Sequence, residues 1–195
     1  MDIAKILVAI ISAIAGFIAP AYFVGIYSPQ VVWTSGYGIP DGVYIATLSD
    51  DNITLSRAFP LRVGPAVFIN FRPLMPGDVV FFYSVVCPAS INFYSDAIAR
   101  VMKDLNIRSI YVVSCENLFL GAEGCTTRAS KMMVDLISKD GIVLGVPEIL
   151  LLTREQPKLF TDFINEKLSQ DPNYTRSRQL WQAIEEFIAT YTGNR

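Results

Sequence analysis

The sequence contains no histidine, only three cysteines and no run of basic residues. Without histidine, the chain cannot use histidine-containing triads, histidine-ligated metals or imidazole acid–base chemistry. Lysine and arginine number 16 against 18 acidic residues, so the sequence gives no electrostatic support for nucleic-acid binding. The cysteines also lack the paired spacing of zinc sites, so we expect no metal and no other cofactor. Any chemistry must therefore use cysteine, serine, lysine or carboxylates.

Apolar residues make up 52% of the 195 residues, and the longest apolar run lies near the N-terminus. Ile6 to Tyr27 is a run of 22 residues without a charge, long enough to cross a hydrocarbon layer of about 30 Å as a helix. We therefore predict a single-pass transmembrane anchor over residues 1–28. Lys5 favours a cytoplasmic N-terminus and an extracytoplasmic C-terminal domain. A signal peptide cleaved near Ala19-Pro20-Ala21 is the alternative.

An extracytoplasmic location permits glycosylation and disulfide formation. Two triplets, Asn52-Ile53-Thr54 and Asn173-Tyr174-Thr175, match the acceptor pattern for N-linked glycans. The cysteines at positions 87, 115 and 125 allow one disulfide and leave one thiol.

The spacing of apolar residues divides the rest of the chain into two parts. Residues 29–77 read as a β-rich extension of short strands broken by turn residues, with one strand expected over 42–49. Residues 78–195 alternate strands with helices, which predicts an α/β domain. In this part we expect strands over 79–84 and 109–114, helices over 91–105 and 126–138, a strand interrupted at Pro147, a helix starting near Pro157 and a closing helix over 180–191.

Local signals indicate where two of these helices begin and end. Asn106 can close the first helix in the left-handed conformation. Thr126 or Thr127 is available as the N-cap of the second, with Asp140-Gly141 as its stop.

Two motifs in this domain resemble the thioredoxin-like family. VVFFYSVVCPAS puts Cys87-Pro88-Ala89-Ser90 at a strand end and a helix start, where that family has its CxxC motif. GIVLGVPEILLL resembles the family's cis-proline strand, with Val146-Pro147 in the position that lies against the active-site cysteine. The resemblance covers about Asp78 to Gln170. It implies a thioredoxin-like mixed sheet flanked by helices, preceded by the transmembrane helix and the β-rich segment.

The resemblance assigns the reactive role to Cys87, because a helix N-terminus favours a thiolate. Ser90 replaces the second cysteine of the motif and Val86 replaces the usual preceding aromatic residue, so a dithiol cycle cannot run within the motif alone. Family members with a CxxS motif are associated with holding or isomerising mixed disulfides. We therefore expect thiol–disulfide exchange or client holding, with Cys87, Ser90 and Pro147 as catalytic residues. Val146 would contribute to binding of an extended polypeptide client.

Cys115 ends the strand that we expect to be parallel and adjacent to the strand leading to Cys87. It can therefore act as a resolving thiol for Cys87. Alternatively, it forms a structural disulfide with Cys125, which would stabilise the short loop by about 3 kcal/mol. We favour the structural disulfide, because exposed loops in oxidising compartments are usually stapled in this way.

Two other functions remain open. A degenerate thioredoxin-like module can serve as an assembly or structural subunit of a membrane complex, and the missing second cysteine favours this alternative. In addition, TSGYGIPDGVY followed by GDVVFF resembles the Ser-x-Pro and Gly-Asp regions of signal-peptidase-like serine proteases. In that case Ser35 would be the nearby serine and Lys131 the base. However, Gly38 stands where the nucleophile is expected, and Lys131 falls within a helical pattern.

Overall fold

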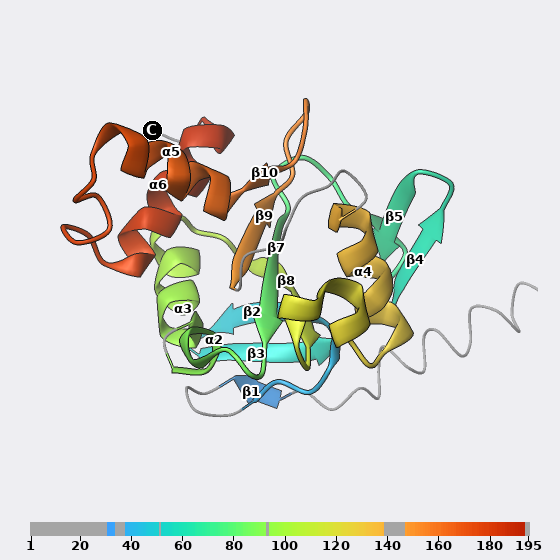
Figure 1. The fold of residues 1–195 in the computed structure, drawn as a ribbon. Helices are drawn as coiled ribbons and strands as arrows, with labels where there is room; N and C mark the ends of the chain where they lie inside the picture. Colours follow the sequence, from blue (N-terminus) through green and yellow to red (C-terminus); the bar gives the residue numbers. More distant parts are fainter. Residues whose placement is uncertain (1–30, 34–37, 51, 93, 139–146, 194–195) are drawn as a thin grey trace, which may run out of the picture.

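The computed structural model describes residues 31–33, 38–50, 52–92, 94–138 and 147–193. It is a mixed α/β fold with a seven-stranded sheet, flanking helices and a separate three-stranded sheet (Figure 1). The elements in chain order are β1 (Val31–Trp33), β2 (Gly42–Ser49), β3 (Asn52–Arg57), β4 (Pro60–Val63), β5 (Ala66–Ile69), β6 (Arg72–Pro73), β7 (Val79–Ser84), α2 (Pro88–Asn92), α3 (Tyr94–Asp104), β8 (Ser109–Cys115), the 3-10 helix η1 (Leu118–Gly124), α4 (Arg128–Ser138), β9 (Glu148–Leu151), β10 (Lys158–Leu159), α5 (Phe160–Gln170) and α6 (Leu180–Thr192).

The large sheet has the strand order β1-β3-β2-β8-β7-β9-β10. β7 and β8 are parallel, as the sequence predicted, and β7 pairs with β9 in the antiparallel sense. All six residues of β7 are buried. A strand covered on both faces is expected to be apolar throughout rather than alternating, and the VVFF run fits this expectation.

Alternate residues of β7 point into two apolar clusters on opposite faces of the sheet. Phe81 and Tyr83 belong to the cluster that includes α3, α5 and α6. Val80 and Phe82 belong to the cluster that includes α4 and the small sheet. Figure 1 shows α3, α5 and α6 on one side of β7, with α4, β4 and β5 on the other.

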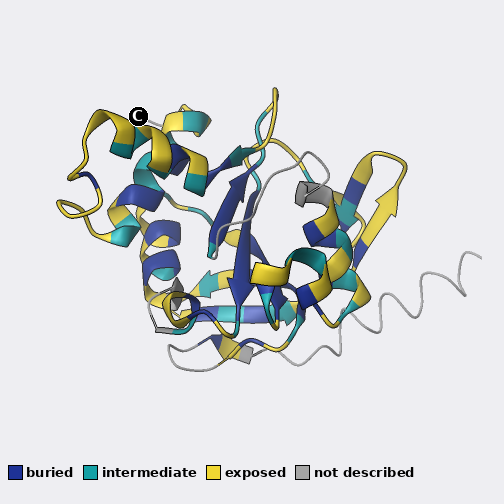
Figure 2. Ribbon diagram, viewed as in Figure 1, coloured by how far each residue is buried: buried dark blue, intermediate teal, exposed yellow. Residues whose placement is uncertain are grey.

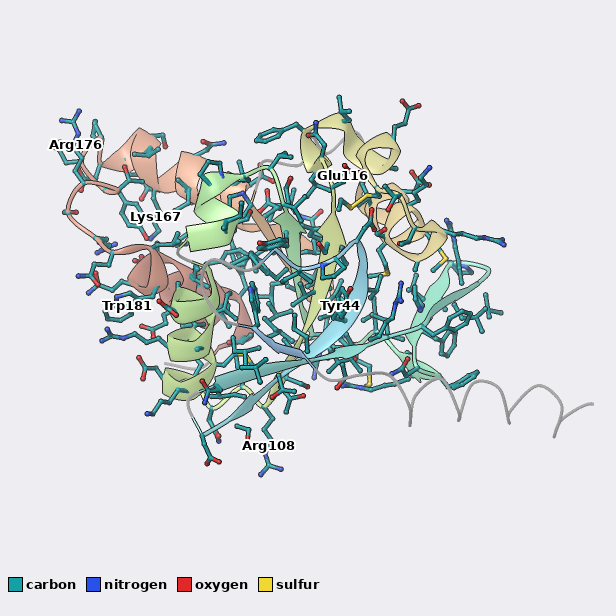
Figure 3. The ribbon with its side chains drawn as sticks, turned by 90° about the horizontal axis from the view of Figure 1, so that it is seen from below. Tyr44, Arg108, Glu116, Lys167, Arg176 and Trp181 are labelled. Carbon is teal, nitrogen blue, oxygen red and sulfur yellow. A yellow bond between two sulfur atoms is a disulfide. The ribbon has the colours of Figure 1, made fainter. Side chains whose placement is uncertain are left out.

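The helical side is also held by contacts between charged and aromatic side chains. The Arg100 guanidinium lies 3.5 Å from the centre of the Trp181 ring, which joins α3 to α6. Lys167 of α5 forms an ion pair of 2.8 Å with Glu186 of α6. Figure 3 shows Lys167 and Trp181 on this side of the molecule and Glu116 on the opposite side.

Most of the predicted elements are confirmed. The strands over 42–49 and 79–84 have the expected bounds, and α4 and α6 follow the predicted apolar periods. Asn106 has a φ of 53°, so it adopts the left-handed conformation just beyond α3. Thr127 Oγ1 accepts a hydrogen bond of 3.2 Å from the Ser130 amide and therefore caps α4. The helix predicted over 91–105 is confirmed in the described residues, which belong to α2 and α3 on either side of position 93. Position 93 itself lies outside the described residues.

The helix predicted near Pro157 is confirmed, but it begins three residues later than Pro157. Lys158 and Leu159 instead form β10, where they pair with Leu151 and Leu150 of β9, and α5 begins only at Phe160. Proline is favoured in a first helical turn, but pairing with the edge of the sheet decides the conformation here.

The strands of the β-rich segment belong to both sheets. β2 pairs with β8, so β1, β2 and β3 extend the same large sheet, while β4, β5 and β6 form the small one. The described helices include none long and apolar enough to cross a bilayer. The predicted anchor over residues 1–28 lies outside the described part of the chain.

Candidate functional site around Cys87

Cys87 lies at the junction between the end of β7 and the start of α2. Its amide donates a hydrogen bond of 3.2 Å to the Ser84 carbonyl, and its own carbonyl accepts one of 3.1 Å from the Ile91 amide. The Val85 amide donates to the Cys115 carbonyl at 3.2 Å, which fixes the turn to the end of β8. The predicted position of Cys87, after a central strand and directly before a helix, is thus confirmed.

The Cys87 side chain points inward. It is 5% exposed and belongs to no disulfide, whereas the side chain of Val86 beside it is half exposed. Burial raises the pKa of the Tyr83 phenol. The Tyr83 hydroxyl has no hydrogen-bond partner among the described residues that would offset this rise. Cys87 therefore lies close to a buried phenol near the end of β7.

Ser90 is fully buried, and its hydroxyl accepts a hydrogen bond of 3.5 Å from the Ser84 amide. The Ser84 hydroxyl in turn accepts one of 3.3 Å from the Leu118 amide at the start of η1. These contacts fasten α2 and η1 to the end of β7. A catalytic role for Ser90 stays a prediction.

The structure joins Cys115 to Cys125 in a disulfide, which is the pairing that the sequence favoured. Cys115 is the Cα partner of Ser84 across the parallel strands, so the disulfide starts at the sheet edge where Cys87 lies. Both disulfide cysteines are buried. In this state Cys115 is not a thiol, and a resolving role would require that the disulfide first be opened.

Pro147 lies at the same end of the sheet, beside the end of β7. It directly precedes Glu148, whose Cα partner is Phe82, two residues before the end of β7. Val146 lies outside the described residues. Contact between Cys87 and the Val146–Pro147 pair therefore stays a prediction, although the strand register brings Pro147 to the correct end of β7.

Glu148 is a buried carboxyl group that the sequence reasoning missed. Its Oε1 atom accepts hydrogen bonds of 3.0 Å from the Ile149 amide and 3.1 Å from the Thr161 amide. No hydrogen-bond partner for Oε2 is found among the described residues. Burial raises the pKa of Glu148, and the bonds from Thr161 and Ile149 offset only part of that rise. The sequence signal that could have predicted this buried carboxyl group is the position of Glu148, between a proline and an apolar strand.

Asp41 is a second missed residue. Its carboxylate accepts hydrogen bonds from the Thr126 amide and hydroxyl, from the Thr127 hydroxyl at 3.0 Å and from the Ser130 hydroxyl. Burial alone would raise the pKa of Asp41, but these hydrogen bonds outweigh it and lower the pKa. Asp41 therefore ties the start of β2 to the residues after Cys125 and to the first turn of α4.

The residues of the protease alternative do not form a site in the described structure. Lys131 is exposed on α4, Gly38 is exposed before β2, and Ser35 lies outside the described residues. An open pocket of about 500 Å³ lies elsewhere, at the start of β7 and the end of β9, where Gly77, Leu152 and Tyr191 contribute to its lining. This is the opposite end of β7 from Cys87.

The described residues contain no group of histidine, cysteine or acidic side chains placed to hold a metal ion. Comparison with known proteins identifies no relative. No protein-family model, no curated protein and no solved structure matches the chain.

Proposed function

We propose that the protein is a membrane-anchored, extracytoplasmic thioredoxin-like protein that exchanges disulfides with protein clients, or holds such clients, through Cys87. The observation that carries the proposal is the position of this cysteine, which follows a buried central strand and directly precedes α2. The order β7, α2–α3, β8, α4, β9 and α5 matches the order that the thioredoxin resemblance implies. The parallel pairing of β7 with β8 adds to this support.

The chemistry suits a single reactive thiol. The Cys87 thiolate attacks one sulfur of a client disulfide, the client S–S bond breaks, a mixed disulfide forms and a client thiolate leaves. Because Ser90 supplies no second thiol, a client thiolate must attack the mixed disulfide and regenerate Cys87. The net reaction rearranges client disulfides and consumes no oxidant or reductant.

The surroundings of Cys87 favour an apolar, unfolded client. Val86 is half exposed, and Phe119 and Leu120 of η1 are each more than 60% exposed. η1 is attached to the end of β7 through the hydrogen bond between Leu118 and Ser84. Since Cys87 itself is nearly covered, exchange requires the β7–α2 turn to move when the client binds.

An isomerase assay tests this proposal. The full-length chain in detergent or nanodiscs is given a model protein with scrambled disulfides, without added oxidant, and recovery of the native pairing is measured. We expect Cys87→Ser to abolish recovery and Ser90→Ala to retain it. Recovery that is equal in wild type and Cys87→Ser would refute the proposal. If the Cys87→Ser variant stays active and recovery is lost only when both Cys115 and Cys125 are replaced by Ala, the exchange runs through Cys115 and Cys125 instead.

The near-complete burial of Cys87 favours a second candidate, a non-catalytic thioredoxin-like assembly or structural subunit of a membrane complex. A fold by itself does not determine activity. This candidate predicts that Cys87→Ser preserves every cellular phenotype while deletion of the gene does not.

A further inference from the structure

The small sheet has an unusual solvent face. Val67 and Ile69 are buried on its inner face, where they join the apolar cluster around α4. The register pairs Leu61 with Phe68 and Val63 with Ala66, so these four side chains share the outer face. A half-buried antiparallel sheet normally has polar residues on its solvent side. This sheet carries apolar residues on both sides.

Five large apolar side chains on and beside this outer face are 39% to 61% exposed. We call them the apolar face: Phe59, Leu61, Val63, Phe71 and Met75. Figure 1 shows the β4–β5 hairpin projecting at one side of the molecule, and Figure 2 shows that β4 is largely exposed. Isolated exposed apolar residues need no explanation, but several of them on and beside one small sheet indicate an interaction surface.

The backbone holds two of these side chains outward. The Phe59 amide donates a hydrogen bond of 2.7 Å to Asn70 Oδ1, and the Asn70 amide donates one of 2.9 Å to the Phe59 carbonyl. Asn70 and Phe71 both have positive φ angles, of 49° and 65°. This left-handed conformation is tolerated by asparagine but disfavoured for a bulky residue such as Phe71. The backbone of the turn that exposes Phe71 is therefore strained.

The charge of this region is also distinctive. Residues 52–77 contain Arg57, Arg62 and Arg72 and no acidic residue, although the whole chain has a net charge of −2. Arg72 Nη2 pairs with Asp78 at 2.8 Å, and the Met75 amide donates to the same carboxylate at 2.8 Å. Asp78 therefore neutralises Arg72, and the register puts Arg62 on the side of Val67, whereas Arg57 is exposed two residues before Phe59. Exposed arginines around aromatic and aliphatic side chains are suited to the headgroup region of an anionic lipid bilayer.

The chain enters the fold next to this face. Val31 at the start of β1 pairs with Leu55, and β3 continues from there towards Phe59. Three residues separate the uncharged run from Ile6 to Tyr27 from Val31. A linker of this length spans at most about 14 Å. An anchor in the bilayer therefore keeps this end of the fold close to the headgroups.

We propose that the apolar face is a second membrane contact, which inserts its side chains into the headgroup and upper acyl region of an anionic bilayer. This inference rests on the membrane anchor of the proposed function. It adds that the folded domain lies against the membrane in one orientation, with β4–β6 towards the lipid, rather than hanging from a loose tether.

Depth-dependent fluorescence quenching tests the proposal. The full-length chain is reconstituted into vesicles of phosphatidylcholine with about 30% phosphatidylglycerol, a fraction chosen to give an anionic surface, with or without brominated acyl chains. Phe71→Trp and Val63→Trp place a probe on the apolar face. Phe119→Trp is the matched control, since Phe119 is 63% exposed and Phe71 61%. The wild-type signal from Trp33 and Trp181 is subtracted.

We expect bromine to quench the added indole of Phe71→Trp and of Val63→Trp by at least about twofold, with a blue shift of emission, because insertion removes only the apolar face from water. The added indole of Phe119→Trp should be unchanged. Equal quenching in all three variants, or none in the first two, would overturn the proposal.

Two further outcomes have distinct meanings. Shielding of the Phe71→Trp probe without bromine quenching, accompanied by concentration-dependent cross-linking, would overturn the membrane contact and assign the face to a second copy of the chain. Vesicle flotation of the wild type separates the two proposals: flotation without quenching overturns only the apolar-face contact, and no flotation overturns the anchor as well.

Discussion

Ser84 and Cys115 are Cα partners at the ends of the two parallel strands. Because of this pairing, the thiol of Cys87 and the disulfide between Cys115 and Cys125 lie at the same end of the sheet, where β7 and β8 finish. The hydrogen bond from Val85 to the Cys115 carbonyl joins the two segments directly. Removal of the disulfide should therefore alter the conformation of the turn that carries Cys87.

Removal of the disulfide should lower the free energy of unfolding substantially. We expect the double replacement of Cys115 and Cys125 by Ala to cost about 3 kcal/mol, from the chain-entropy estimate for a loop of roughly ten residues. Urea unfolding measures the loss. Both proteins carry Cys87→Ser, so that no new pairing can form. A loss below about 1 kcal/mol would show that the loop is held by its other contacts, among them those of Asp41.

Asp41 should stabilise the fold in a pH-dependent way. Its pKa is lowered in the folded protein, so its contribution is present above the unfolded value of about 3.9 and is lost as the pH falls through the folded value. We expect Asp41→Asn to cost about 1 kcal/mol at pH 7, the size of a capping contact, and less towards pH 3. Asp135→Asn, an exposed change on α4, is the control. A cost for Asp41→Asn that does not change with pH would contradict this assignment.

Glu148 should act in the opposite direction. Burial raises its pKa in the folded protein, so the unfolded chain ionises first and stability declines as the pH rises from about 4.3 towards the folded value. Glu148→Gln keeps an acceptor oxygen for Ile149 and Thr161 but cannot ionise. Relative to the wild type, its unfolding free energy should improve between pH 4 and pH 8. The exposed Glu155→Gln is the control, and an unchanged difference across this range would show that Glu148 does not titrate as described.

The sequence predicted those parts of the fold that depend on local pattern. β2 and β7 were found because residues over 42–49 and 79–84 are apolar runs bounded by turn signals, and α4 because its apolar residues follow a helical period. Asn106 and Thr127 act as predicted because capping depends on a few neighbouring residues.

The remaining features depend on contacts between distant residues. Asp41 bonds to Ser130 across 89 positions, and no local pattern marks that pair. β10 forms because Lys158 and Leu159 pair with β9. This pairing outweighs the helical signal of Pro157. The apolar face was missed because its exposed residues look like ordinary strand residues until the register shows which side they occupy.

The reactivity of Cys87 in the folded protein tests the central claim most directly. The full-length chain is mixed with oxidised glutathione, and formation of the mixed disulfide at Cys87 is followed by mass spectrometry, once under native conditions and once in denaturant at the same pH. The account predicts that native Cys87 reacts at least as fast as unfolded Cys87, because a site built for exchange opens its turn without global unfolding. A native rate several orders of magnitude lower, and equal to the rate of unfolding, would contradict it.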